Sequence, residues 1–310
     1  MKKKKQKNLT QQLPIHTRNN IILKLLLPNQ ESHRTEATNL IDVNFLEQTI
    51  SYLKQIKEKK RNKKGWYARS MLNKKLSGVE ICWNAAISLA TLRNEYKTTV
   101  KDTVHKIANQ RYKDTIKLIE SMVDDFEDVS LNLTIGTGSS KISLNHTDVV
   151  MIINALATRK AGITGGVWST VGKRVEKPLM ITLCKLLDVP EEYYDLKRAK
   201  FERRSEVREI DFHLFPDEKT KHKCEVKLSG IKNTESADVV WARDTKVLVS
   251  DFLSDVQKKL LPGEGRLWVS MDDGNAVKQF AHVLTELDIP YTPFNGDLAS
   301  KLNKIFKTID

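Results

Sequence analysis

Apolar residues recur at intervals of three and four in the first part of the chain, a spacing typical of one face of an amphipathic helix. The clearest example predicts a helix over residues 42–60, whose apolar positions are Val43, Leu46, Ile50, Leu53 and Ile56. The same spacing predicts helices over residues 78–96 and 100–126. We therefore expect roughly the first 126 residues to be mainly helical.

The middle of the chain combines a short alternating segment with glycine-rich turns. Leu131, Leu133 and Ile135 alternate with polar residues and end at a glycine turn over 136–138. Asn145 is expected to cap a helix that runs to Lys160. A glycine-broken turn at 162–166 should separate it from a second helix over 168–187. This pair could also be a helix-turn-helix, although the connecting turn is long.

Beyond residue 190 the pattern changes to short β-type runs. Residues 209–215 and 222–228 are predicted strands of a hairpin, joined by a polar Pro-Asp-Glu turn. Residues 246–249 and 266–270 are further predicted strands, followed by helical stretches at 252–261 and 276–287. Such alternation implies a central sheet covered by helices. We predict an α/β fold, with a mainly helical region over residues 1–129 and a core of mixed β-sheet flanked by helices over residues 130–310.

Positive charge is concentrated near the start of the chain. The net charge is +13, yet residues 1–120 hold 25 Lys and Arg against 10 Asp and Glu, while the remaining residues hold 27 against 29. With 40% hydrophobic residues, the chain is expected to fold and to bind a polyanion. One basic run, Lys57, Lys59, Lys60, Arg61, Lys63 and Lys64, precedes Trp66 and Tyr67. This run could contact phosphates and bases, or be the solvated end of a helix.

Several classes of protein are excluded by the sequence. The longest strongly apolar run, residues 21–27, is too short to span a bilayer. No apolar signal segment follows the lysines at 2–5. Three scattered cysteines, Cys82, Cys184 and Cys224, suit a reducing compartment. We therefore predict a cytoplasmic protein without disulfides.

Two acids and a lysine can converge on the predicted hairpin. The side-chain period of a strand places Glu225 and Lys227 on one face, and Asp211 on the neighbouring strand can join them. Acidic oxygens suit Mg²⁺, which can activate a water and stabilise charge on a phosphate. Lys227 would then orient or deprotonate the attacking water. A surface hairpin with ordinary charged residues is the alternative. Residues 172–176 are expected to open a helix, and Glu176 there could supply a third carboxylate.

This order, a helix bearing Glu176, then Asp211, then Glu225-Val226-Lys227, resembles the PD-(D/E)xK nucleases, with Ile210 where that superfamily often has proline. The sequence further resembles type II restriction endonucleases of the CfrBI family, over roughly residues 130–270. The matching segments are residues 162–166 with Trp168 and Glu176, residues 225–228, residues 233–238 and residues 242–247. The resemblance implies a Mg²⁺-dependent endonuclease that cuts both strands of a short palindromic DNA site and leaves 5′-phosphates. It also implies that Asp211, Glu225 and the Val226 carbonyl hold the metal, that Lys227 handles the water and that Glu176 assists.

A palindromic target calls for a twofold-symmetric homodimer. A cognate DNA methyltransferase would protect the bacterial or archaeal host, and the helical region would serve DNA binding or dimerisation. Candidate DNA contacts are Arg159, Lys160, Lys173 and Arg174 near the predicted glycine turn, Lys232, Asn233 and Arg243, and Lys60, Arg61, Lys63, Lys64 and Trp66. Two alternatives remain: a repair or junction-resolving nuclease of the same superfamily, and a non-catalytic DNA-binding regulator.

Overall fold

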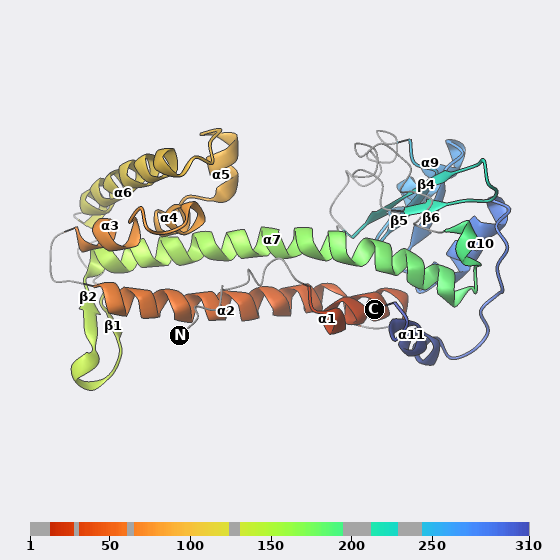
Figure 1. Ribbon diagram of the computed structural model, residues 1–310, viewed down its shortest axis with the longest axis horizontal. Coiled ribbons are helices and arrows are strands. Elements are labelled where there is room, and N and C mark those ends of the chain that lie inside the picture. Colours follow the sequence, from red (N-terminus) through yellow and green to blue (C-terminus); the bar gives the residue numbers. More distant parts are fainter. Residues whose placement is uncertain are drawn as a thin grey trace. The chain divides into compact units, whose positions relative to one another are not determined.

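The computed structural model describes residues 13–27, 31–60, 65–123, 131–194, 212–228 and 244–309. The chain forms two compact units, which we call the helical unit (residues 39–167) and the sheet unit (residues 1–38 and 168–310). Figure 1 labels most of their helices and strands. This division differs from the predicted boundary near residue 130, because residues 131–167 group with the helices that precede them. None of the described helices is long and apolar enough to cross a membrane.

The helical unit confirms that the first part of the chain is mainly helical. Its elements are α2 (Arg34–Lys59, which begins in the sheet unit), α3 (Trp66–Met71), α4 (Gly78–Asn84), α5 (Leu89–Asn94), α6 (Lys101–Val123), β1 (Leu133–Ile135), η2 (Gly138–Ser140), β2 (Ile142–Leu144) and the first part of α7 (His146–Leu186). The alternating segment is β1, and it pairs antiparallel with β2, a strand the sequence did not predict. Gly136, at a φ of 104°, allows the turn between them.

The single helix predicted over residues 78–96 is wrong, because two short helices occupy this segment. After α4 ends, Ala86 adopts a φ of 54°, which no continuous helix allows. The Ser88 side chain then accepts a hydrogen bond from the Thr91 N–H and caps α5. Local capping therefore outweighs the apolar periodicity here.

The predicted apolar face of α2 is only partly buried. Ile56 is fully buried, but the side chains of Val43, Leu46 and Ile50 are exposed by 53%, 60% and 54%. These three residues lie at spacings of three and four on one side of the helix, and we call them the α2 stripe. The part of this apolar face formed by the α2 stripe therefore stays largely open to solvent within the described chain.

No turn interrupts residues 162–166, because α7 runs without a break through Gly162, Gly165 and Gly166. The predicted glycine turn and the helix-turn-helix alternative are therefore wrong. Gly162 has a packing role instead, since a Cβ there would lie only 3.3 Å from Trp83 Nε1. The predicted cap is confirmed, because the Asn145 side chain accepts a hydrogen bond from the Asp148 N–H.

The sheet unit contains one mixed four-stranded sheet. Its strands are β3 (Phe212–Leu214), β4 (His222–Lys227), β5 (Val247–Ser250) and β6 (Leu267–Ser270), in that spatial order. The β3–β4 hairpin is antiparallel, as predicted, whereas β4, β5 and β6 are parallel. The helices predicted after β5 and β6 are α9 (Asp255–Gly263) and α10 (Ala276–Glu286). The sequence did not predict α1 (Ile15–Leu26), η3 (Glu191–Tyr193) or α11 (Leu298–Phe306). The mixed α/β class is thus confirmed.

Helices cover both faces of this sheet, as Figure 1 shows. On one face, Leu248 and Trp268 pack with Leu261 of α9. On the other, Cys224 of β4 lies near Cys184 of α7, and burial together with Cys224 raises the pKa of the Cys184 thiol. Side chains alternate along a strand, so Lys223, Glu225 and Lys227 point to the face opposite Cys224, which is the face covered by α9.

Candidate active site

Glu225 and Lys227 lie in contact on strand β4. The Glu225 carboxylate is completely buried, the Lys227 side chain is about one quarter exposed, and the Lys227 ammonium forms an ion pair with Glu225 Oε1. The two residues share the face of the sheet that α9 covers, because they are two positions apart on a strand. Burial penalises an isolated carboxylate, so the adjacent ammonium stabilises its charged form. The structure thus brings together two of the four predicted catalytic residues.

Asp211, the third predicted residue, lies outside the described residues. The hairpin that should carry it is described from the next residue on, where Phe212 is paired with Cys224 and His213 with Lys223. The hairpin prediction is therefore confirmed, whereas the role of Asp211 stays a prediction.

Glu176, the fourth predicted residue, does not open a helix. It lies well inside α7, which begins at His146, so the predicted helix start at residues 172–176 is wrong. Its half-buried carboxylate bends back over Gly172, where an added Cβ would lie 3.1 Å from Glu176 Oε1. The role of Glu176 alongside the hairpin residues stays a prediction.

The described ranges contain no group of three or more His, Cys, Asp or Glu side chains placed to hold a metal ion. The chemistry of the predicted ligands nevertheless fits a hard cation, because Glu225 supplies a buried carboxylate and Val226 a carbonyl oxygen. A complete set of ligands would depend on Asp211, which is not among the described residues.

Asp251 is a buried acid beside this pair that sequence reasoning missed. It follows the last residue of β5, and its N–H donates a hydrogen bond of 3.0 Å to the Lys227 carbonyl. Its Oδ2 atom lies 3.4 Å from Nε2 of His33. One sequence feature could have identified Asp251: it comes directly after the buried strand β5. An acid in that position lies at the carboxyl edge of the sheet, where α/β proteins bind ligands.

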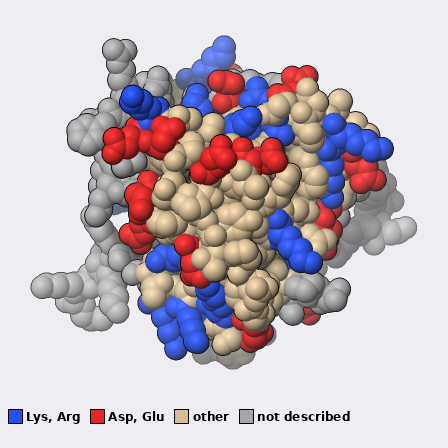
Figure 2. Space-filling model, turned by 90° about the vertical axis from the view of Figure 1, so that its right-hand side faces the viewer, with Lys and Arg blue, Asp and Glu red and all other residues tan. Residues whose placement is uncertain are grey.

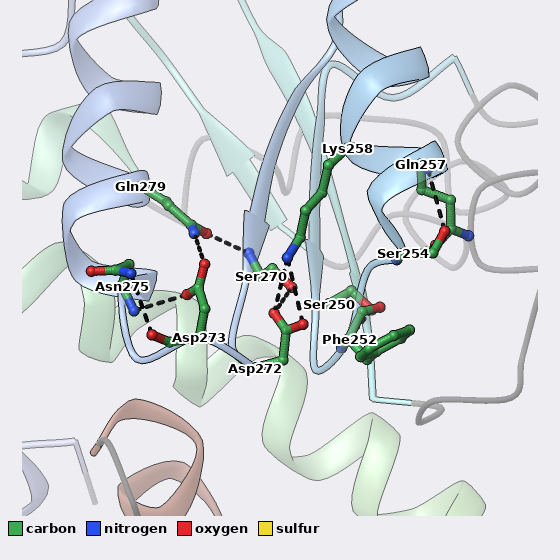
Figure 3. A network of polar contacts seen from close by, with 10 residues as sticks. All are labelled: Ser250, Phe252, Ser254, Gln257, Lys258, Ser270, Asp272, Asp273, Asn275 and Gln279. Carbon is green, nitrogen blue, oxygen red and sulfur yellow. Dashed lines mark hydrogen bonds and ion pairs between the residues drawn. The ribbon is translucent and has the colours of Figure 1, made fainter.

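Polar residues follow the same edge across all three parallel strands. Lys227, Ser250 and Ser270 stand side by side in the register of β4, β5 and β6. Figure 3 shows the network beyond β5 and β6, in which the Ser270 hydroxyl donates to Asp272 and Lys258 lies 3.4 Å from the same carboxylate. Gln279 of α10 accepts a hydrogen bond of 2.7 Å from the Ser270 N–H and donates one to Asp273. The loop after β6 is thereby fixed by side chains.

Lys60 and Trp66 are held by a buried acid rather than presented to solvent. Lys60 Nζ lies 2.5 Å from Asp148 Oδ2, and Trp66 Nε1 donates a hydrogen bond of 2.9 Å to Asp148 Oδ1. Trp66 is only 4% exposed, so its ring cannot stack on a base. The prediction that Trp66 contacts DNA is therefore not supported. Arg61, Lys63 and Lys64 lie outside the described residues.

Arg159 is a packing residue rather than a surface cation. Its guanidinium lies 4.3 Å from the centre of the Tyr52 ring and 5.3 Å from that of Trp83, and it donates a hydrogen bond to the Asn84 side chain. Burial lowers the pKa of Arg159 and raises that of Tyr52 to about 12. The predicted phosphate contact at Arg159 is therefore not supported. Its neighbour Lys160 is half exposed and lies 3.9 Å from Asp42.

Lys173 and Arg174 remain accessible. Both are exposed on α7, in the sheet unit, although they lie in the body of the helix rather than near a turn. On the face drawn in Figure 2, basic and acidic side chains are interspersed around an uncharged area, in keeping with the nearly balanced charge beyond residue 120. Lys232, Asn233 and Arg243 lie outside the described residues.

Comparison with known proteins gives one match. A family model described as CfrBI restriction endonuclease matches residues 16–258, which include every residue predicted to act in catalysis. No curated protein and no solved structure gives a significant match.

Proposed function

Because the chain belongs to the CfrBI restriction endonuclease family, we propose that it is a type II site-specific deoxyribonuclease. It would hydrolyse both strands of double-stranded DNA at a short palindromic site, depend on Mg²⁺ and leave 5′-phosphates. The contact between the buried Glu225 carboxylate and Lys227, on a strand between two others, is the observation that carries this proposal. A buried acid beside an ammonium at the carboxyl end of a strand is costly to maintain and is typical of a reactive site.

The chain offers ligands for the divalent ion in the hairpin. Asp211, Glu225 and the Val226 carbonyl would hold Mg²⁺, and Glu176 would assist. When bound, the ion would polarise the scissile phosphate and lower the pKa of a water. The proposed ligands are all oxygen atoms, the ligands that Mg²⁺ prefers.

Lys227 would act on the nucleophile. Its ammonium is held by Glu225 at a defined position, from which it can orient a water and offset the charge on a phosphate. A neutral Lys227 amine could also accept the proton that the attacking water loses. Asp251 supports this geometry through its backbone, since its N–H fixes the Lys227 carbonyl.

The α2 stripe supports the proposed homodimer. Exposed apolar side chains gathered on one helix face commonly mark an interaction surface. A second copy of the chain would bury Val43, Leu46 and Ile50 against the same residues around a twofold axis, as a palindromic target requires. The helical unit would then provide dimerisation, and the sheet unit would provide cleavage.

The proposed DNA contacts follow from exposure. Lys173 and Arg174 are available to phosphates, as is half-exposed Lys160. Lys232, Asn233, Arg243, Arg61, Lys63 and Lys64 stay predictions. In a bacterial or archaeal cytoplasm, a cognate DNA methyltransferase would protect the host DNA from this activity.

Plasmid digestion tests the proposal. Purified full-length protein is incubated with a plasmid of known sequence in Mg²⁺ and in EDTA, and the ends of the products are sequenced. Defined fragments that share one cut sequence, formed only in Mg²⁺, are expected. Nicking that follows DNA structure rather than sequence would instead favour a repair or junction-resolving enzyme, and DNA binding without cleavage would favour a regulator.

A further inference from the structure

A basic pocket of about 690 Å³ lies beside the edge strand β6. The side chains that line it come from the starts of β5 and β6 and from α9 and α10. Its charged and titratable lining comprises Lys246, Lys258, Arg266, Lys278, His282 and Glu286. Four permanent cations and one acid line the pocket, and two of these cations, Lys258 and Arg266, also form ion pairs with Asp272 at 3.4 Å and Asp244 at 3.6 Å. The lining itself keeps a net positive charge, which attracts anions.

The pocket is separate from the proposed active site. Lys246 and Arg266 precede the first residues of β5 and β6, whereas Lys227 is aligned with Ser250 at the other end of β5. The four steps from residue 246 to residue 250 span about 13 Å along a strand, and β4 is two strands, or roughly 10 Å, from β6. One small ligand could not occupy both places.

Two of the lining side chains are held in a fixed orientation by hydrogen bonds to the backbone. Lys246 Nζ donates a hydrogen bond of 2.6 Å to the Gly265 carbonyl, and Arg266 donates one to the Thr245 carbonyl. These two bonds tie together the segments that lead into β5 and β6. Because both cations are held in place, a ligand would not need to order them on binding.

Two further lining side chains, both on α10, have unused hydrogen-bonding capacity. Lys278 and His282 lie one turn apart on α10, and both are exposed. Within the described part of the chain, neither side chain has an ion-pair or hydrogen-bond partner. They can therefore donate to a phosphate without giving up an existing contact.

An aromatic ring completes the pocket. Trp268 of β6 is partly exposed, and its ring packs against the Leu248 cluster while Lys258 Nζ lies 5.6 Å from its centre. A planar base can stack on tryptophan while neighbouring cations bind its phosphate. A volume of about 690 Å³ falls in the range of sites that hold small ligands.

We propose that this pocket binds a nucleotide, with the phosphate between Arg266 and Lys278 and the base against Trp268. The nucleotide could be free, or could be one unit of a DNA strand away from the cleaved bond. In both cases the pocket would recognise a phosphate and a base. The proposal does not depend on the nuclease function, because it concerns different residues and a binding equilibrium.

Calorimetry of the full-length protein in EDTA, where Mg²⁺-dependent cleavage is suppressed, tests this site. The probes are deoxyadenosine 5′-monophosphate, inorganic phosphate and deoxyadenosine. The monophosphate should bind at least about tenfold more tightly than either part alone, since it gains both the ionic and the stacking contacts. Comparable affinity for inorganic phosphate and the monophosphate would overturn the proposed base contact.

Matched variants locate the binding. Lys278→Glu should weaken monophosphate binding by roughly tenfold or more, because attraction becomes repulsion in the pocket. Lys259→Glu makes the same charge change at an exposed position of α9 outside the pocket lining, and should change affinity less than about twofold. Equal losses in the two variants would overturn the proposal.

The aromatic contact is tested separately. Trp268→Leu should weaken binding of the monophosphate and leave inorganic phosphate unaffected, whereas Trp268→Phe should restore much of the affinity. Thermal unfolding of both variants checks that the Leu248 cluster remains packed. Loss of both probes in a folded Trp268→Leu protein would contradict the stacking role.

Competition distinguishes the two sources of the nucleotide. If the site serves DNA, a short duplex should displace the bound monophosphate from wild type, and Lys278→Glu should weaken duplex binding. If it serves a free nucleotide, the duplex and the monophosphate should bind together. These readouts are binding measurements, so an inactive nuclease would not obscure them.

Discussion

The Lys227 ammonium contacts the carboxylate of Glu225, a residue two positions earlier on β4 that is completely buried. We propose that this relationship is both structural and functional. A buried charge needs a partner to remain stable, and the partner here is the group proposed to act on the attacking water. Substitutions at these two positions therefore test whether the pair serves stability, catalysis or both.

Glu225→Gln should separate stability from activity. The amide keeps the shape of the side chain and can still accept a hydrogen bond from Lys227, and the quarter-exposed ammonium can reach water. We expect the free energy of unfolding to change by no more than about 1 kcal/mol. DNA cleavage should fall at least about 100-fold, the scale of losing one group that stabilises the transition state.

Urea unfolding and plasmid cleavage of the same Glu225→Gln preparation measure the two effects. Lys223→Ala is the control, because it alters a charged residue on the same face of β4 outside the proposed site. Cleavage by Glu225→Gln at the wild-type rate would show that this carboxylate has no part in the chemistry.

Gly165→Ala tests whether α7 is continuous. Nothing lies within 4 Å of a Cβ added at Gly165, so alanine should stabilise the helix by about 0.5–1 kcal/mol through its higher helix propensity. Gly162→Ala is the matched comparison, because its Cβ would lie 3.3 Å from Trp83 Nε1. Gly162→Ala should therefore stabilise the protein less than Gly165→Ala does, or destabilise it. A lower melting temperature for Gly165→Ala than for wild type would argue for the turn that the sequence suggested.

These glycines show where sequence reasoning fails and why. A cluster of glycines usually breaks a helix, but here the buried Ile163 and Val167 pack α7 through the glycine segment, and Gly162 leaves room for Trp83. The hairpin at residues 212–227 and the helices after β5 and β6 were predictable, because their apolar runs and turn residues are local signals. Asp251 was not, since its significance depends on strand order, and the burial of Arg159 and Trp66 depends on tertiary packing.

Arg159 and the pair Lys173 and Arg174 should affect different properties. Arg159→Ala removes contacts with Tyr52, Trp83 and Asn84 and should lower the free energy of unfolding by about 2 kcal/mol or more. It should leave the salt dependence of DNA binding by the folded protein unchanged. Urea unfolding and DNA titrations at several salt concentrations separate these effects. A reduced salt slope without a loss of stability would restore Arg159 as a phosphate contact.

Lys173→Ala combined with Arg174→Ala should behave in the opposite way. Both side chains are exposed, so stability should change by less than about 0.5 kcal/mol. If each contacts one phosphate, the slope of log K against log salt should become shallower by about 2. An unchanged slope would exclude this part of α7 from the DNA interface.

The α2 stripe should hold two copies of the chain together. Leu46→Glu places a charge in the middle of the stripe and should weaken dimerisation by at least about tenfold, because a central apolar contact is lost. Leu118→Glu, on α6, makes the same change at a similarly exposed leucine and should leave the dimer intact. Sedimentation velocity measures the outcome. A monomeric wild-type protein, or equal dissociation in both variants, would contradict a dimer through α2.

The most direct measurement of the proposed function is plasmid cleavage by wild-type protein and by Lys227→Ala, each in Mg²⁺ and in EDTA. Thermal unfolding confirms that both proteins are folded at the assay temperature. Wild type should give defined fragments in Mg²⁺ only, and Lys227→Ala should cut at least about 100-fold more slowly, as expected when a group acting on the nucleophile is lost. A Lys227→Ala variant that cuts as fast as wild type, or a plasmid left intact by wild type in Mg²⁺, would contradict the proposed function.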